Sequence, residues 1–306
     1  MKTNAAARRW GVLGLAGLLI LGVGACKRAE KTEATAAEAS APKEKRHPLT
    51  GEILRIEAER NVLVIRHDDI PGVMPAMTME FVVSPGDVKA VKVGQRIRAQ
   101  LVEPAGDGEW RLEQIWPADP VSANAVEAKA LALRQETLSR GKSAYREIGD
   151  RIPEFALYDQ NGEVVQSGRF RGKKVMLNFI FTRCPIATMC PAATMKMTSA
   201  QQLAREAGIE NLEFVSITLD PAYDTPGVLK DYADARGIDT TNFSFLTGPE
   251  NAIRDLLANF GVLVEFEGDL LKHTLATLLI DEQGRIIHRA DGSAWEPKDF
   301  VAKIKR

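Results

Sequence analysis

Between residues 47 and 116, apolar and polar positions alternate over short stretches, which is the pattern of half-buried β-strands. Ile97, Ala99 and Leu101 alternate with polar neighbours, and residues 62–65 form an apolar run that begins after a polar turn. Five such stretches, separated by turns rich in Gly, Pro and Asp, lie within about 70 residues. This pattern predicts a small closed β-barrel, which we assign to residues 47–118.

From residue 147 to the C-terminus, β-type apolar runs alternate with helical periods. Residues 175–181 form a β-branched and aromatic run, whereas the apolar residues of 253–260 recur at helical spacing. Thr225 and Pro226 have the residue types of a helix start, with threonine as the cap and proline in the first turn. The alternation predicts an α/β domain of thioredoxin-like fold over residues 147–306.

The segment between the two predicted domains, residues 119–146, includes a stretch rich in Ala, Glu, Lys and Arg. This composition predicts a connecting helix, and we expect it to act as a semi-rigid spacer.

The N-terminus has the features of a secretory signal. Arg8 and Arg9 precede a short apolar stretch that ends in small residues before Cys26. The cysteine in this place resembles the bacterial lipobox, which implies a signal peptide over residues 1–25 and a lipid on Cys26. An uncleaved signal anchor is the alternative. In both cases we expect an exported chain on the periplasmic side of a bacterial membrane and attached to it, with residues 26–46 as a flexible linker.

Charge and cysteine content narrow the chemistry. The formal net charge is −1, which gives no indication of a nucleic-acid partner. Of the three cysteines, Cys26 is assigned to the lipid, so that one pair remains, Cys184 and Cys190. In an exported protein, a pair of thiols tends to oxidise unless a reductant or a metal protects it.

The cysteine pair follows directly on the apolar run 175–181, and a helical pattern comes after it. Open α/β folds place their chemistry at this end of a strand. A thiol near a helix N-terminus is expected to be stabilised as thiolate, the form that attacks disulfides and binds metals. The pair could therefore carry out redox chemistry, hold a soft metal or form an inert disulfide.

Two features separate this domain from an ordinary thioredoxin. Cys184 and Cys190 are spaced C-x5-C rather than C-x2-C. Ala276 occupies the place of the usual cis-proline, and His273 stands three residues upstream of it. Two thiolates and one imidazole make a soft three-coordinate site that accepts copper.

A second group of soft donors lies in the predicted barrel. Met74, Met77 and Met79 are three of the eight methionines and follow His67 closely. Thioether sulfur and imidazole suit Cu(I), and residues two apart on a strand point to the same side. We favour a metal site over the alternative, methionines that fill an irregular core.

At these residues the first domain resembles the CusF-like periplasmic copper-binding domains, which are small OB-type barrels. The resemblance implies His67, Met77 and Met79 as copper ligands, in the order His…Met-x-Met. Met74 stands where the best-known members have a tryptophan, so that it becomes a further ligand candidate.

The second domain resembles the Sco/SenC family in three motifs: FTRCP with the second cysteine, ITLDPAYDTP (217–226) and KHTLATLLIDEQGR (272–285). The resemblance implies Cys184, Cys190 and His273 as copper ligands and Asp220 as an acidic residue near the site, orienting His273 or assisting transfer. The chain departs from the family's C-x3-C spacing by two extra residues.

Two hypotheses follow. In the first, the chain is a membrane-anchored copper chaperone whose barrel feeds or buffers the dithiol–histidine site. We expect copper as the cargo, as Cu(I) and also as Cu(II). The Sco/SenC resemblance implies delivery to the copper A site of cytochrome c oxidase, with oxidase subunit II as the client. In the second, the chain is a thiol-disulfide oxidoreductase that keeps the cysteines of a client protein reduced.

Overall fold

The computed structural model describes residues 44–104, 106–141, 144–267 and 270–304. These residues belong to one compact unit, Glu44–Arg306. No helix among the described residues is both long and apolar enough to span a bilayer. The predicted signal peptide, most of the linker and Cys26 lie outside the described residues.

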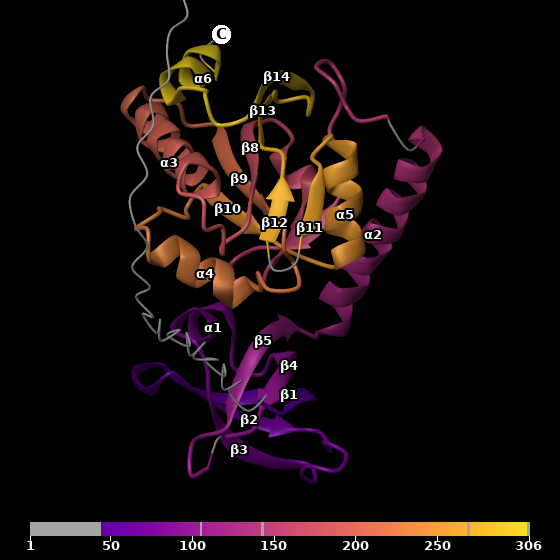
Figure 1. Ribbon diagram of the computed structural model, residues 1–306, viewed down its shortest axis with the longest axis vertical. Helices are drawn as coiled ribbons and strands as arrows, with labels where there is room; N and C mark the ends of the chain where they lie inside the picture. The colour runs from indigo at the N-terminus through magenta and orange to yellow at the C-terminus, as the bar shows by residue number, and fades with distance from the viewer. Residues whose placement is uncertain (1–43, 105, 142–143, 268–269, 305–306) are drawn as a thin grey trace, which may run out of the picture. The chain divides into compact units, whose positions relative to one another are not determined.

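The first domain is a closed barrel with the strand order β1-β2-β3-β5-β4 (Figure 1). Its interior is formed by apolar side chains that the strands direct inward, among them Leu63, Ile65 and Phe81. Its strands are β1 (Arg46–Glu57), β2 (Val62–His67), β3 (Met77–Val82), β4 (Arg96–Val102) and β5 (Arg111–Pro117), with a short 3-10 turn η1 (Ala58–Arg60) after β1.

The barrel also contains a short helix, α1 (Pro85–Ala90), in a stretch whose Pro, Gly and Asp residues predicted a turn. Ser84 caps this helix, since its Oγ accepts a hydrogen bond of 3.0 Å from the Asp87 backbone N–H. Pro85 occupies the first turn, where its missing N–H costs nothing. Ser84 and Pro85, followed by Asp87, therefore begin a helix rather than form a turn.

The second domain is built on a five-stranded sheet with the order β10-β9-β8-β13-β14. Strands β8, β9 and β10 are parallel, and β13 and β14 are antiparallel to their neighbours. Helices α3 and α6 lie on one side of this sheet and α5 on the other, which is the predicted thioredoxin-like arrangement (Figure 1).

The bounds of its elements follow. The sheet strands are β8 (Lys174–Ile180), β9 (Leu212–Thr218), β10 (Phe243–Leu246), β13 (Ala276–Ile280) and β14 (Ile286–Asp291). The helices are α3 (Cys190–Glu206), α4 (Pro226–Asp234), α5 (Glu250–Asn259) and α6 (Pro297–Ile304). Two hairpins stand beside the sheet, β6 (Ala156–Tyr158) with β7 (Val164–Gln166), and β11 (Val264–Glu267) with β12 (Leu270–His273), and η2 (Ser167–Phe170) follows β7.

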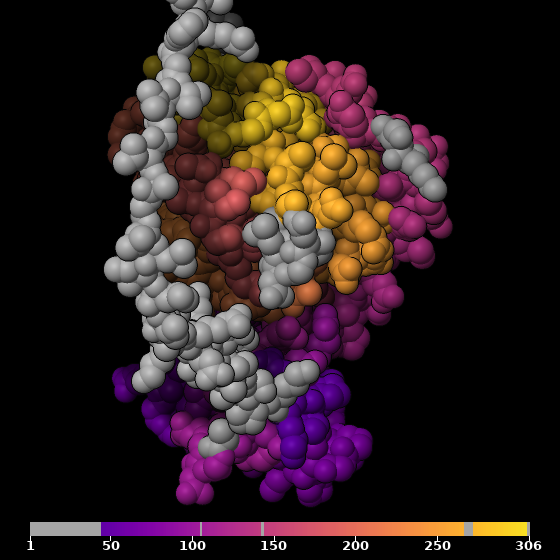
Figure 2. All heavy atoms as spheres, in the orientation of Figure 1, coloured from indigo at the N-terminus to yellow at the C-terminus, as the bar shows by residue number. Residues whose placement is uncertain are grey.

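The connector forms a helix, α2 (Pro120–Arg140), that packs along α5. Arg134 pairs with Asp255 at 2.9 Å, and the Asn259 side-chain amide donates to Thr137 Oγ1 at 2.8 Å. Figure 2 shows α2 and α5 side by side on the surface of the second domain. The expectation of a spacer between the domains is therefore wrong, because these contacts make α2 a part of the second domain.

The barrel packs on the second domain through α1 and α4. The two helices approach so closely that a Cβ on Gly86 would overlap the carbonyl oxygen of Gly227. Trp116 of the barrel meets Tyr158 edge to face, with ring centroids 6.2 Å apart. Backbone contact of this kind is possible only where glycine replaces a side chain.

We expect Gly86→Ala to destabilise the protein, because the new methyl group also lies 2.6 Å from Asp231 Cγ and must push α1 off α4. Overpacking of this kind costs about 1–3 kcal/mol in the free energy of unfolding, which urea titration followed by circular dichroism measures. Gly168→Ala is the matched control, since no described atom lies within 4 Å of its added Cβ. Equal stability of the two variants would contradict the close α1–α4 packing.

Candidate metal centres

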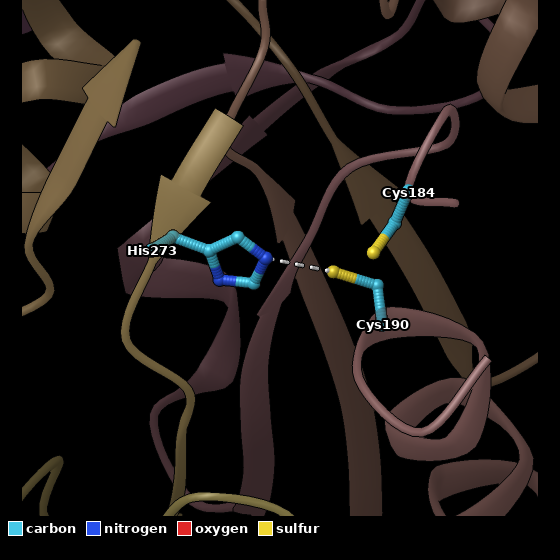
Figure 3. A group of neighbouring side chains, drawn as sticks. All are labelled: Cys184, Cys190 and His273. Atoms are coloured by element: carbon cyan, nitrogen blue, oxygen red, sulfur yellow. Dashed lines mark hydrogen bonds between the residues drawn. The ribbon is translucent and has the colours of Figure 1, made fainter. Parts of the chain in front are cut away.

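The two remaining cysteines and His273 come together from three separate segments (Figure 3). Cys184 lies in the turn after β8, where its backbone N–H donates to the Phe181 carbonyl at 3.3 Å. Cys190 is the first residue of α3, and His273 is the last residue of β12. The ligand atoms of these three side chains all lie within 4.8 Å of one another. The structure thus assembles the predicted dithiol–histidine group.

The hydrogen bonds of His273 fix its tautomer. Nδ1 lies 3.1 Å from the carbonyl oxygen of Thr274, which can only accept, so a neutral ring donates from Nδ1. Nε2 then carries a lone pair and accepts from the Cys190 thiol, whose Sγ lies 3.3 Å away. The lone pair that would bind a metal is therefore already aimed at the sulfur atoms.

Burial sets the protonation of this group. Cys190 is fully buried, and removal from water raises the pKa of its thiol to about 12, with the nearby Cys184 adding to the effect. Burial also lowers the pKa of His273. The expected stabilisation of thiolate at the helix N-terminus is therefore wrong for Cys190, because desolvation outweighs it. At neutral pH this thiol is protonated and the imidazole uncharged.

The donor set fits a soft cation. Thiolate and imidazole ligands suit Cu(I), whereas carboxylates, which hard cations prefer, are not part of the group. A cation bound here would displace the Cys190 proton, since only the thiolate is a strong ligand.

Of the two roles predicted for Asp220, the structure does not support the orientation of His273, and assistance in transfer stays a prediction. Both ring nitrogens of His273 have other partners, Thr274 and Cys190. The Asp220 carboxylate instead accepts a hydrogen bond of 2.5 Å from the Arg183 guanidinium. Its contact with the site therefore runs through the residue that directly precedes Cys184.

Sequence reasoning missed Asp224, which is fully buried beneath the turn that carries Cys184. Its carboxylate accepts hydrogen bonds from the Thr182 backbone N–H at 3.2 Å, from the Thr182 hydroxyl and from the Thr218 hydroxyl at 2.6 Å. Burial raises its pKa to about 6. The motif ITLDPAYDTP contained this residue, but nothing in the sequence distinguished it from a helix-flanking polar residue.

The second predicted site lies at one end of the barrel. His67 ends β2 and is paired in register with Met77, the first residue of β3. Met79 lies two residues further along β3 on the same face and packs partly against the barrel core. Met77 is 47% exposed, so one sulfur-bearing side chain is open to solvent. The structure therefore brings His67 and these two methionines to one face of the sheet.

The hydrogen bond of His67 leaves the lone pair of its Nε2 available for a metal, as it does in His273. Its Nδ1 lies 2.8 Å from the carbonyl oxygen of Asp68, which assigns the Nδ1 proton. The side chain is 1% exposed, and Nε2 is buried with no hydrogen-bond partner among the described residues. A buried polar atom without a partner is costly, and a metal ion would satisfy it.

Met74 lies in the segment between β2 and β3, where it forms an isolated bridge with Ile70. Its side chain packs partly against the barrel core. Its role as a further ligand stays a prediction.

Comparisons with known proteins separate the chain into the same two parts. Residues 144–306 match the family model SCO1/SenC, and residues 46–117 match the model of the copper-binding periplasmic protein CusF. An SCO2-like protein of Rickettsia typhi is 35% identical over 156 residues, which cover 48% of this chain and 74% of the relative. The SCO1 protein homologue of Bacillus subtilis is 29% identical over 159 residues, covering 50% and 81%.

Solved structures are similar to the second domain. A SCO1/SenC family lipoprotein from Bacillus anthracis is 28% identical with a TM-score of 0.48, and the match covers 53% of this chain and 98% of that one. Bradyrhizobium japonicum ScoI with copper bound is 25% identical with a TM-score of 0.44, covering 52% and 99%.

The difference in burial between the thiols predicts unequal reactivity. In the reduced protein at pH 8, we expect iodoacetamide to modify Cys184 at least ten times faster than Cys190, because Cys190 is buried and its raised pKa keeps it protonated. Mass spectrometry of peptides from timed samples measures both rates. In Cys184→Ala the labelling of the Cys190 peptide should stay slow, and similar rates at Cys184 and Cys190 in the unaltered protein would contradict the assignment.

Proposed function

The chain belongs to the SCO1/SenC family, and we propose that it is a copper chaperone that carries its cargo on Cys184, Cys190 and His273. The observation that supports this most strongly is the convergence of two thiols and one imidazole within 4.8 Å, contributed by the turn after β8, the start of α3 and the end of β12. Copper exchange between proteins requires ligands that a partner can reach. Cys184 and His273 are partly exposed, whereas Cys190 is buried behind them.

The barrel is the second copper site of the proposal. Its similarity to CusF supports His67, Met77 and Met79 as ligands, with Met74 as a further candidate. The buried Nε2 of His67, which has no partner in the described part of the chain, also supports them. Thioethers cannot form disulfides, so this site stays able to bind copper when the two thiols are oxidised. The barrel would then hold copper until the dithiol site is reduced.

The client in this proposal is a copper enzyme assembled at the membrane. The family resemblance points to the copper A site of cytochrome c oxidase and to its subunit II as the recipient. Export by the signal peptide and a lipid on Cys26 would keep the chaperone on the periplasmic side of the membrane, next to such a client.

The alternative function is thiol-disulfide exchange, and the unequal burial of the two thiols favours it. The partly exposed Cys184 would attack a client disulfide as thiolate, forming a mixed disulfide and releasing one client thiol. Cys190, after giving up its proton, would then attack Cys184 Sγ and release the second client thiol. The client gains two electrons, and the chain is left with a Cys184–Cys190 disulfide.

Titration of the reduced protein with Cu(I) under competition by a chelator should reveal two sites. Cys184→Ala should remove one, and Met77→Leu with Met79→Leu should remove the other. Because Cu(I) displaces the Cys190 proton, whose pKa is raised to about 12, affinity at the dithiol site should rise at least about tenfold per pH unit between pH 6 and 8.

The barrel provides the internal control for this pH dependence. Thioethers carry no proton, so the affinity of the barrel site should change less with pH over the same range. A single site in the unaltered protein would contradict the chaperone with two copper sites. A dithiol that exchanges rapidly with client disulfides but has no affinity for Cu(I) would favour the alternative.

A further inference from the structure

We propose that the segment Asp220–Gly227 couples the barrel to the copper loop, here the turn 181–184, so that contact with the barrel sets the properties of the dithiol site. The segment runs from the end of β9 into the first turn of α4. One side of the segment contacts Thr182 and Arg183, the two residues before Cys184. The other side contacts the barrel. The inferred effect on copper affinity rests on the proposed function. The inferred effect on the stability of a Cys184–Cys190 disulfide does not.

Asp224 holds the copper loop at Thr182. Its buried carboxylate accepts from both the backbone N–H and the hydroxyl of Thr182, and it is held in turn by the Thr218 hydroxyl. Thr182 stands two residues before Cys184, so a shift of Asp224 moves the start of the copper loop. Hydrogen bonds to a buried carboxylate are among the strongest available, which makes this connection stiff.

Asp220 and Tyr223 hold the next residue, Arg183. The guanidinium donates to Asp220 at 2.5 Å, and its Cζ lies 4.0 Å from the centroid of the Tyr223 ring. Arg183 is thereby fixed by an ion pair and a cation–π contact at once. The two residues before Cys184 are thus bound to three positions of a single short segment.

The barrel holds the same segment through Gln114 of β5. The Gln114 side-chain amide donates to the Ala222 carbonyl oxygen at 3.2 Å. Gln114 has a φ of 53°, a left-handed conformation that few residues other than glycine, asparagine and aspartate adopt. The β4–β5 pairing shifts register beside Gln114, so this φ belongs to a β-bulge of the barrel, from which the side chain reaches Ala222.

The barrel also meets the far end of the segment. A Cβ on Gly227 would overlap the carboxylate of Asp87 and lie 2.8 Å from the Asp87 backbone nitrogen, so α1 and the start of α4 are in direct contact. Tyr223 lines a cavity of about 480 Å³ together with Ser84 and Gln114 of the barrel. The ring that contacts Arg183 therefore also borders on the barrel.

These contacts make the segment a mechanical link between the two domains. Direct contacts transmit small displacements, and the segment has two with the barrel, the hydrogen bond from Gln114 to Ala222 and the backbone contact at Gly227. A change in how the barrel meets Ala222 would therefore alter the position of Cys184 relative to Cys190 and His273. Gln114 and Tyr223 are positioning residues in this inference, since neither provides a copper ligand.

The test compares Gln114→Gly with Lys92→Ala in the full-length protein. Glycine relieves the strained φ and removes the contact with Ala222, so the fold is expected to be retained. Lys92 pairs with Glu163 at the same domain contact but does not touch the segment, which makes Lys92→Ala the matched control. Tyr223→Leu interrupts the link at its other side.

The first readout needs no copper. Oxidised glutathione takes two electrons from the thiols of Cys184 and Cys190, giving one disulfide and two molecules of reduced glutathione. We expect Gln114→Gly and Tyr223→Leu each to change this equilibrium constant about tenfold, which corresponds to about 30 mV. Lys92→Ala should stay within twofold of the unaltered protein. The second readout is the Cu(I) affinity of the dithiol site, which should change in the same variants.

The double variant is decisive. If both residues act along one link, the variant with both substitutions changes the glutathione equilibrium constant by less than the product of the two single fold-changes. An unchanged equilibrium constant in Gln114→Gly, or shifts that multiply in the double variant, would overturn the coupling. Altered glutathione equilibria in a protein that binds no Cu(I) would support the coupling and refute the proposed copper function.

Discussion

The chemistry of the second domain depends on the thiol of Cys190, which is buried and stays protonated unless another group replaces its proton. Cys190 is fully buried at the first position of α3, and burial raises its pKa to about 12. Its proton is directed at the neutral His273 ring. A cation or a neighbouring sulfur must therefore replace that proton, and either event couples binding or oxidation to proton release. This keeps the resting site uncharged and protects Cys190 from solvent oxidants.

The histidines of the two candidate sites make the same hydrogen bond, although the two domains have different folds. In each, the histidine at the end of a strand donates from Nδ1 to the carbonyl oxygen of the next residue, Asp68 in the barrel and Thr274 in the second domain. The backbone thus selects the tautomer and leaves Nε2 for the ligand position. The difference lies in the candidate sulfur ligands. Thioether ligands would make the barrel site independent of redox state, whereas thiol ligands would make the second site responsive to it.

The sequence predicted both domains, because a two-residue period, helical periods and the residues of a helix start are local signals. It also predicted that Cys184, Cys190 and His273 would converge, through motifs in family order. It failed where tertiary contacts decide. Arg134 and Thr137 anchor the connecting helix on α5, which makes it part of the second domain, and no sequence pattern predicted the hairpin of β11 and β12. Asp224 matters only because folding places it beneath Thr182, which no local pattern reveals.

The central claim is that two thiolates and one imidazole of the second domain hold copper together. X-ray absorption at the copper K-edge tests it most directly, in a protein whose barrel site is removed by Met77→Leu and Met79→Leu. With one equivalent of Cu(I), we expect two sulfurs and one nitrogen around the copper ion, and we expect the nitrogen to be lost in His273→Ala. A shell without sulfur, or a spectrum that His273→Ala leaves unchanged, would contradict it.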